Sequence, residues 1–244
     1  MPNPVFLTAE WRRLLMLNFE IDPAVLEPRV PAGTELDTFE GQTLVSLVGF
    51  RFLRTQVCGW SIPGHQDFDE VNLRFYVRRE HPEGLRRGVV FIREIVPRMA
   101  ISLVARWVYQ EPYVTRPMRH RFEPPFSSDH ALEGLGYGWF EHGRWQQLSA
   151  TLPGPARPLQ PGSAAEFLTE HYWGYTRLRD GSTAEYQVEH APWNVWDVET
   201  CAADLDATEV YGRDFGQALS RPPVSALVAD GSPVIVRRGT RITG

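Results

Sequence analysis

One short segment alternates polar and apolar residues, and its polar residues are of the types that carry out acid–base chemistry. The polar members are Glu70, Asn72, Arg74 and Tyr76, and the apolar members are Val71, Leu73, Phe75 and Val77. Successive residues of a β-strand point to opposite faces, so the segment predicts a strand with one polar face. Facing an interior cavity, Glu70 would act as general acid or base and Arg74 would bind a carboxylate. The competing interpretation is a solvent-facing strand with an ordinary ladder of charges.

The chain contains no lysine, and all 25 of its basic residues are arginine. Asparagine is also scarce, which is typical of a GC-rich coding sequence. A guanidinium group does not form a Schiff base with a carbonyl compound, whereas a lysine amine does. The composition therefore excludes every mechanism that needs a lysine Schiff base.

Two further side chains are candidates for binding a small ligand. Arg106 lies in a segment from about 98 to 109 whose apolar residues recur at helical spacing, and Pro112 ends that segment. An arginine among apolar residues usually has a carboxylate partner or a ligand, and a structural ion pair is the simpler of the two. Tyr113 would donate a hydrogen bond into a cavity, although tyrosines with wet hydroxyls are also ordinary core residues.

The segment from His190 to Trp193 is the other place where chemistry is expected. His190 would relay a proton near neutral pH, and Trp193 would supply an apolar wall for a ligand. Alternatively, His190 joins a buried polar network and the tryptophans, including Trp196, pack against the sheet. The run from Glu170 to Trp173 has polar groups that would fasten a helix to the sheet.

Composition and charge limit the partners. The net charge is −5 and arginines are scattered among acidic residues, so no basic stripe for nucleic acid is present. The start of the chain lacks the pattern of a secretory signal, and no apolar run reaches the ~20 residues that span a bilayer. Cys58 and Cys201 are isolated, which fits reduced thiols in a cytoplasmic protein. We expect a cytoplasmic protein with no membrane or nucleic-acid partner.

No metal or cofactor motif stands out. The seven histidines are dispersed, with no pair at the spacing of a zinc site. The glycines at 134, 136 and 138 lack the spacing and the strand-to-helix context of a dinucleotide loop. We therefore expect neither a metal nor a cofactor.

Short apolar runs separated by turn residues predict a chain rich in strands, with a few short helices. Asp22 is expected to cap one helical turn that begins at Pro23, and Ala164 to Glu170 is expected to form another helix. Predicted strands span about 14–19, 36–39, 43–52, 71–79, 88–96, 135–140, 145–152, 183–189 and 234–238. The strands at 36–39 and 43–52 are expected to form a hairpin around Glu40 and Gly41. With no linker or repeat, residues 1–244 are expected to form a single domain.

Several of these segments resemble a known bacterial family. The strand from Phe68 to Arg78 resembles the signature of the uncharacterised YqjF-like proteins, the domain of unknown function 2071. Three further segments resemble sequence patterns of that family. They are Val30 to Gly41, Arg106 with Glu111 to Tyr113, and Val188 to Trp193. Together these segments cover most of the chain from about Trp11 to Trp193.

That family is similar in fold to acetoacetate decarboxylase. The resemblance implies an α+β, mainly β protein, in which a large curved antiparallel sheet forms a cone or partial barrel around an interior pocket. Arg106 and Pro112 keep the spacing of the decarboxylase active-site stretch, but Tyr113 and Val114 stand where that enzyme has its lysine pair. Glu70 resembles a pocket carboxylate of the decarboxylase. The resemblance thus implies a pocket without the lysine chemistry.

Two functional classes follow from these observations. The first is an enzyme that acts on a small keto acid or carboxylate, with Glu70 and His190 as proton carriers, and Arg74, Arg106, Tyr113, Asn72 and Trp193 binding the substrate. The second is a noncatalytic protein that binds or senses a small ligand in the same pocket. A purely structural role is third. Sheets often protect an edge by pairing with a second copy, so a homodimer is a further expectation.

Overall fold

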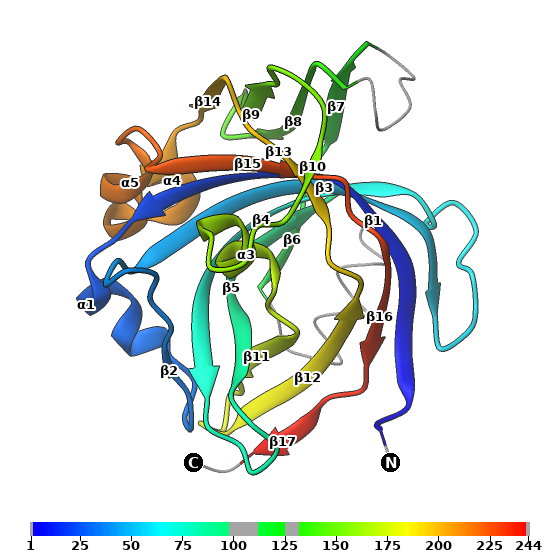
Figure 1. The fold of residues 1–244 in the computed structure, drawn as a ribbon, viewed down its shortest axis with the longest axis vertical. Helices are drawn as coiled ribbons and strands as arrows, with labels where there is room; N and C mark the ends of the chain where they lie inside the picture. Colours follow the sequence, from blue (N-terminus) through cyan, green and yellow to red (C-terminus); the bar gives the residue numbers. More distant parts are fainter. Residues whose placement is uncertain (1, 98–111, 125–131, 243–244) are drawn as a thin grey trace.

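The computed structural model describes residues 2–97, 112–124 and 132–242, and the description below is confined to them. Most of these residues are in two antiparallel-dominated sheets (Figure 1). The strands of the large sheet are β1 (Val5–Glu20), β2 (Glu35–Leu36), β3 (Leu44–Val57), β4 (Phe68–Arg79), β5 (Arg86–Val96), β6 (Tyr113–Thr115), β10 (Arg157–Pro158), β11 (Trp173–Arg177), β12 (Thr183–His190), β13 (Asn194–Trp196), β15 (Ser225–Ala229), β16 (Pro233–Arg237) and β17 (Thr240–Ile242). The strands of the small sheet are β7 (Met118–Glu123), β8 (Gly134–Glu141), β9 (Arg144–Thr151) and β14 (Thr200–Asp204).

The helices of the described residues are short. They are α1 (Pro23–Leu26), the 3-10 turn η1 (Glu27–Arg29), α3 (Ala164–Thr169), α4 (Ala207–Tyr211) and α5 (Arg213–Leu219). Asp22 caps α1 as predicted, because its side chain accepts a hydrogen bond of 2.9 Å from the amide of Ala24. In the described part of the chain, no helix has the length and apolar character needed to cross a membrane.

The large sheet closes on itself. Its strands pair in the order β1, β16, β12, β11, β5, β4 and β3, and β3 pairs again with β1, which gives a ring of strands. Irregularities in pairing bend the long strands around the ring: β1 and β3 slip in register where Arg13 and Arg54 adopt positive φ. The mainly β fold with a ring-forming curved sheet agrees with the expectation from the sequence.

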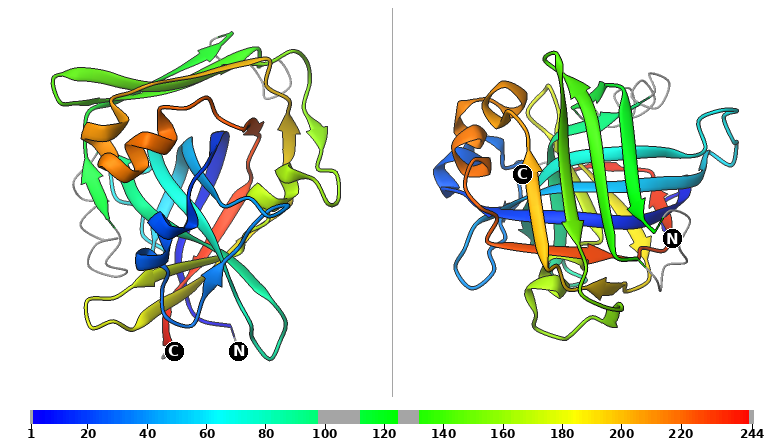
Figure 2. Two further views of the ribbon diagram at one scale, coloured as in Figure 1. Left: turned by 90° about the vertical axis from the view of Figure 1, so that its left-hand side faces the viewer. Right: turned by 90° about the horizontal axis from the view of Figure 1, so that it is seen from above.

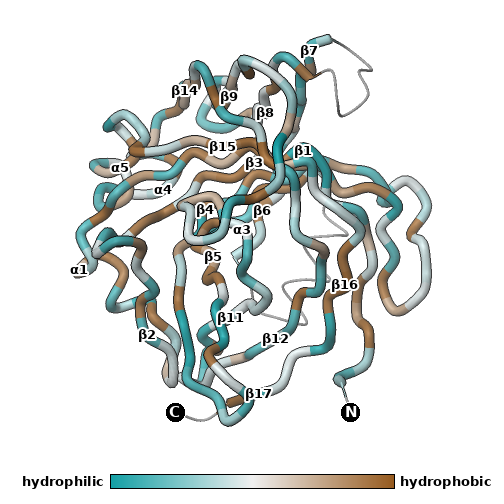
Figure 3. The backbone as a smooth tube through the Cα atoms, viewed as in Figure 1, coloured by the Kyte–Doolittle hydropathy of each residue, from teal (hydrophilic) through white to brown (hydrophobic). Residues whose placement is uncertain are grey.

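Strand β4 is buried on both faces. Its apolar residues, including Val71 and Leu73, belong to a core outside the ring that also contains Tyr137 and Trp139 of the small sheet. The small sheet lies across the outer surface of the ring at this point (Figure 2). In the hydropathy view, β15 and β3 are coloured as largely hydrophobic where they pass beneath it (Figure 3). The polar face of β4 is therefore turned toward the interior of the ring.

The predicted hairpin turn at Glu40 and Gly41 is present: both residues adopt positive φ, and the backbones of Phe39 and Gln42 exchange two hydrogen bonds across it. The pairing does not continue beyond this bridge, because β2 pairs with β4 and not with β3. The reason is topological: β3 is paired with β1 along one edge and with β4 along the other, so neither edge is open to β2. The strands predicted at 71–79 and 88–96 are present as β4 and β5, and these two strands pair with each other.

Gly49 on β3 packs directly against Tyr137 of the small sheet, and we expect its replacement by alanine to destabilise the protein. A Cβ at this position would lie 2.6 Å from Cδ2 of Tyr137, whose hydroxyl is itself held by the carbonyl oxygen of Arg13 at 2.8 Å. Overpacking of this kind costs about 1–3 kcal/mol. Urea unfolding of G49A should show that loss. The control G154A places its Cβ in open space and should unfold like the wild type.

Candidate functional site

A cavity of about 100 Å³ lies inside the ring of strands. Most of its wall is apolar and comes from β1, β3, β5, β12 and β16. The polar lining residues come from β4, β5, β6 and β12 and from the segment after α3; among the described residues they include Glu70, Asn72, Arg74, Glu94, Tyr113, His171 and Tyr186. The cavity therefore combines an apolar wall with a concentrated group of ionisable and hydrogen-bonding side chains.

Glu70 is the buried carboxylate at the centre of this group. It is 2% exposed, and its Oε1 accepts a hydrogen bond of 3.0 Å from the side-chain amide of Asn72. The hydroxyl of Tyr113 lies 3.5 Å from Oε2, at the long limit of a hydrogen bond. These two contacts orient the carboxylate of Glu70 in the wall of the cavity.

Two polar atoms of the cavity-lining residues of β4 have no hydrogen-bond partner among the described residues. One is the acceptor Oδ1 of Asn72, whose side chain is almost wholly buried, and the other is the donor Nε of Arg74. The Nη2 of Arg74 donates to the carbonyl oxygen of Leu168 at 3.0 Å, which fixes the guanidinium beside the cavity. Buried polar groups in native proteins are nearly always satisfied, so atoms of this kind mark a position where a ligand or water completes the set.

A second carboxylate, Glu94, lies opposite Asn72 in the strand pairing and is not suggested by local sequence. Asn72 of β4 is the direct partner of Glu94 of β5, and Glu94 is in turn paired in register with Tyr113 of β6. Directly opposed residues share one face of a sheet. Three strands thus place Asn72, Glu94 and Tyr113 in one row on the cavity face. Glu70 is the next residue of β4 on that face, two positions before Asn72.

His171 also lines the cavity, although the sequence pointed to His190 instead. Its ring packs against Tyr76 at 4.7 Å between centroids, and its Nε2 lies 3.6 Å from Oδ2 of Asp37. Asp37 accepts a hydrogen bond of 2.7 Å from Arg87. Burial, together with the positive charges of Arg74 and Arg87, lowers the pKa of His171 to about 4 against the opposing effect of Asp37. At neutral pH the ring is therefore uncharged.

This buried histidine gives a prediction for stability against pH. Because the pKa of His171 is lower in the folded chain than its ordinary value of 6.5, the unfolded chain binds more protons between these two values. The free energy of unfolding should fall as the pH drops from about 6.5 toward 4, and the histidine should account for roughly 2 kcal/mol of the loss between pH 7 and pH 4.5.

Replacement of His171 by asparagine should remove that part of the pH dependence, whatever its effect on stability at pH 7. Urea unfolding at pH 7 and pH 4.5 measures the difference for each variant. H142N is the matched control, since His142 is exposed and adopts a positive φ that asparagine tolerates. An unchanged pH dependence in H171N would contradict the assignment.

His190 and Trp193 are close to each other but are not among the residues that line the cavity. The ring of His190 is stacked between Tyr172 and Trp193, with centroid distances of 4.7 and 4.3 Å, and its Nδ1 lies 3.0 Å from the carbonyl oxygen of Ala191. Burial lowers the pKa of His190. Trp193 is buried behind Trp11, which itself lines the cavity.

The remaining candidate, Arg106, and the predicted helix that carries it lie outside the described residues. Trp196 is buried in the core between the two sheets, which agrees with a packing role. Of the residues that the sequence suggested for a site, the structure thus brings Glu70, Asn72, Arg74 and Tyr113 together around one cavity.

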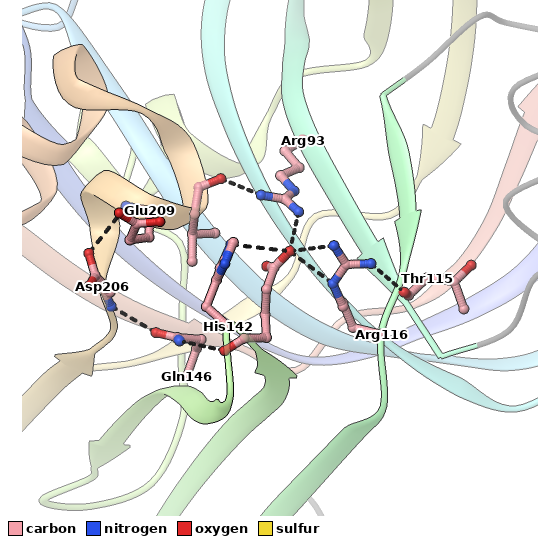
Figure 4. A network of polar contacts seen from close by, with 9 residues as sticks. Arg93, Thr115, Arg116, His142, Gln146, Asp206 and Glu209 are labelled. Carbon is pink, nitrogen blue, oxygen red and sulfur yellow. Dashed lines mark hydrogen bonds and ion pairs between the residues drawn. The ribbon is translucent and has the colours of Figure 1, made fainter.

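A buried ionic network holds the strands that carry Glu94 and Tyr113 (Figure 4). The carboxylate of Glu141, on β8, accepts hydrogen bonds from Arg93 of β5 at 2.5 Å and from Nε of Arg116, just after β6, at 2.8 Å. Arg93 also donates to the carbonyl oxygen of Val210 in α4. The residues of this network connect the two sheets and α4. We therefore infer that the network positions β5 and β6, the strands that carry Glu94 and Tyr113.

A much larger hollow, about 900 Å³, lies along the small sheet, and we do not assign it as the site. The glycines at 134, 136 and 138 lie on β8, and Gly136 and Gly138 line this hollow, so this run is a strand and not a phosphate-binding loop. The guanidinium of Arg119 lies over the ring of Trp145 at 4.1 Å, across Gly138. Among residues 2–97, 112–124 and 132–242, no group of histidine, cysteine or acidic side chains is arranged to hold a metal ion.

The ring of strands has the fold of acetoacetate decarboxylase-like enzymes. Acetoacetate decarboxylase from Legionella pneumophila matches with a TM-score of 0.67 at 14% identity, over 98% of this chain and 88% of that one. The enduracididine biosynthesis enzyme MppR complexed with pyruvate matches with a TM-score of 0.66 at 16% identity, over 100% of this chain and 92% of that one. At these identities the similarity establishes the fold.

The sequence places the chain more narrowly. The model of the domain of unknown function 2071, described as an uncharacterised conserved protein, matches residues 8–233, and the chain belongs to that family. The uncharacterised protein YqjF of Bacillus subtilis (strain 168) is 27% identical over 220 residues, which are 86% of this chain and 84% of that protein. The family resemblance drawn from the sequence segments is therefore confirmed.

Proposed function

We propose that the protein is an acid–base enzyme that acts on a small 2-oxo acid or related carboxylate bound inside the ring of strands. The observation that carries the proposal is the buried Glu70, oriented by Asn72 and Tyr113, in a cavity that also presents the guanidinium of Arg74. A buried carboxylate beside a cation and an apolar wall is the combination used to move a proton on a small anionic compound.

The roles follow from the chemistry of each group. Arg74 binds the carboxylate of the substrate by charge-assisted hydrogen bonds. Glu70 takes a proton from the carbon next to the carbonyl group, and the electrons of the broken C–H bond form the double bond of an enolate whose charge resides on oxygen. Tyr113 is the nearby hydroxyl donor that would stabilise this charge. The apolar wall excludes water and strengthens these interactions.

The size of the cavity supports a small substrate. A volume of about 100 Å³ has room for a molecule of roughly ten non-hydrogen atoms or fewer. The structurally similar MppR has been obtained complexed with pyruvate, which makes pyruvate the first probe for this cavity. Because the chain has no lysine, its chemistry differs from that of a decarboxylase that forms a lysine Schiff base.

The alternative is a noncatalytic protein that binds the same class of ligand. The row formed by Asn72, Glu94 and Tyr113 favours neither class by itself. Both classes predict binding of pyruvate, which isothermal titration calorimetry measures. Only the enzyme catalyses exchange of the C3 hydrogens of pyruvate with deuterium from solvent, which proton NMR follows. Binding without exchange would favour the alternative, and absence of binding for every small 2-oxo acid would contradict both.

A further inference from the structure

A second hollow of about 60 Å³ adjoins the cavity and shares part of its lining with it. Five residues line both hollows: Phe6, Leu7, Phe52, Glu70 and Tyr113. Glu70 and Tyr113 therefore stand at the junction between the two. We refer to the second hollow, lined further by Thr55, Val57, Ile62, His65 and Phe68, as the annexe.

The two hollows differ in chemistry. Asn72, Arg74, Glu94 and His171 line the main cavity and are not among the residues that line the annexe. Apart from the shared pair at the junction, the annexe has mainly phenylalanine and aliphatic side chains in its wall. A molecule that occupies both would carry its charge at one end and a hydrocarbon group at the other, with the reacting atoms beside Glu70.

We propose that the site takes 2-oxo acids with an unbranched hydrocarbon chain of several carbons, with the carboxylate at Arg74 and the chain in the annexe. This inference rests on the proposed function and names its substrate class. A volume of 60 Å³ accommodates roughly five non-hydrogen atoms, which sets the length of chain that gains from burial. Each methylene that enters an apolar pocket strengthens binding about fourfold.

Ile62 is the residue best placed to test the annexe. It belongs to the loop between β3 and β4, whose base is closed by hydrogen bonds from the amide of Thr55 to the carbonyl oxygen of Gln66 and from the amide of Arg54 to Asp67. Ile62 is half-buried, whereas its neighbour Ser61 is exposed. A larger side chain at 62 fills the annexe without entering either sheet.

The experiment measures dissociation constants by calorimetry for straight-chain 2-oxo acids from pyruvate to 2-oxooctanoate. In the wild type, affinity should rise about fourfold per methylene until the annexe is full, and then level off. In I62W the affinity for 2-oxohexanoate should fall at least tenfold more than the affinity for pyruvate, while I62A should extend the rise to longer acids. S61W, which adds the same ring at an exposed position of the same loop, should keep the wild-type profile.

The outcomes separate this inference from the proposed function. Affinity that is independent of chain length, or an equal loss for pyruvate and 2-oxohexanoate in I62W, would overturn the inference and leave the proposed function standing. The affinity could rise with chain length and lose this rise in I62W, while the protein catalyses no exchange of C3 hydrogens. That result would support the annexe and refute the enzymatic role. No binding of any member of the series would overturn both.

Discussion

Replacement of Glu70 by glutamine is expected to slow the exchange of the C3 hydrogens of pyruvate with solvent by a factor of about 10² to 10⁴, the usual contribution of a general base. Glutamine has nearly the same shape as glutamate and still offers an oxygen to the amide of Asn72, but it does not take up a proton at neutral pH. The cavity should therefore keep its form while losing its base. Proton NMR in deuterated buffer measures the exchange rate directly.

The matched control for E70Q is E35Q. Glu35 is an exposed carboxylate on β2, next to β4, and pairs with Arg78 at the surface. Its replacement removes the same charge from a neighbouring strand and should leave exchange at the wild-type rate. Exchange in E70Q at the wild-type rate would show that another group is the base.

Replacement of Arg74 by glutamine is expected to raise the dissociation constant for pyruvate roughly 10- to 150-fold, because hydrogen bonds to a charged group contribute about 1.5–3 kcal/mol. Affinity for the uncharged pyruvamide should change much less, since that compound has no carboxylate for the guanidinium to bind. Calorimetric titration of the two ligands against the two proteins gives the comparison.

R78Q is the control for this prediction. Arg78 lies on the same strand, and its side chain, which is 42% exposed, pairs with Glu35 instead of lining the cavity. Its replacement should leave both affinities as they are in the wild type. If R74Q and the wild type bound pyruvate equally, Arg74 would be a structural side chain fastened to Leu168 and not the carboxylate-binding group.

The sequence was informative about β4 because local alternation is enough to sort its residues into two faces. Local alternation does not determine which parts of the protein pack against each face. The apolar face of Val71 and Leu73 packs on the small sheet, and the polar face of Glu70 and Asn72 closes against distant strands. Both faces are consequently buried, and the interpretation of β4 as a solvent-facing strand is wrong.

The rest of the cavity could not be derived from local pattern. Glu94 reaches Asn72 only through the register between β4 and β5, which shifts at Leu73 and Arg74. His171 enters from the segment after α3, nearly a hundred residues along the chain from Arg74. Such placements depend on long-range strand pairing, which leaves no periodic signal in the sequence.

Several elements in the last third of the chain were also missed. Helices α4 and α5 span only Ala207–Tyr211 and Arg213–Leu219, too short for a helical period to be recognised. Strand β15, Ser225–Ala229, follows Pro222 and Pro223, which predict a loop, yet it is held in the sheet by pairing with β1 and β13. In each case tertiary packing and not local propensity decides the structure.

The most direct test of the central claim is a crystal structure of the protein soaked with pyruvate. The account predicts density for the ligand inside the ring of strands, with its carboxylate within about 3 Å of the Arg74 guanidinium and its methyl carbon beside the carboxylate of Glu70. Pyruvate bound elsewhere, or a cavity that holds only water at saturating pyruvate, would contradict the assignment of Glu70 and Arg74 to a substrate site.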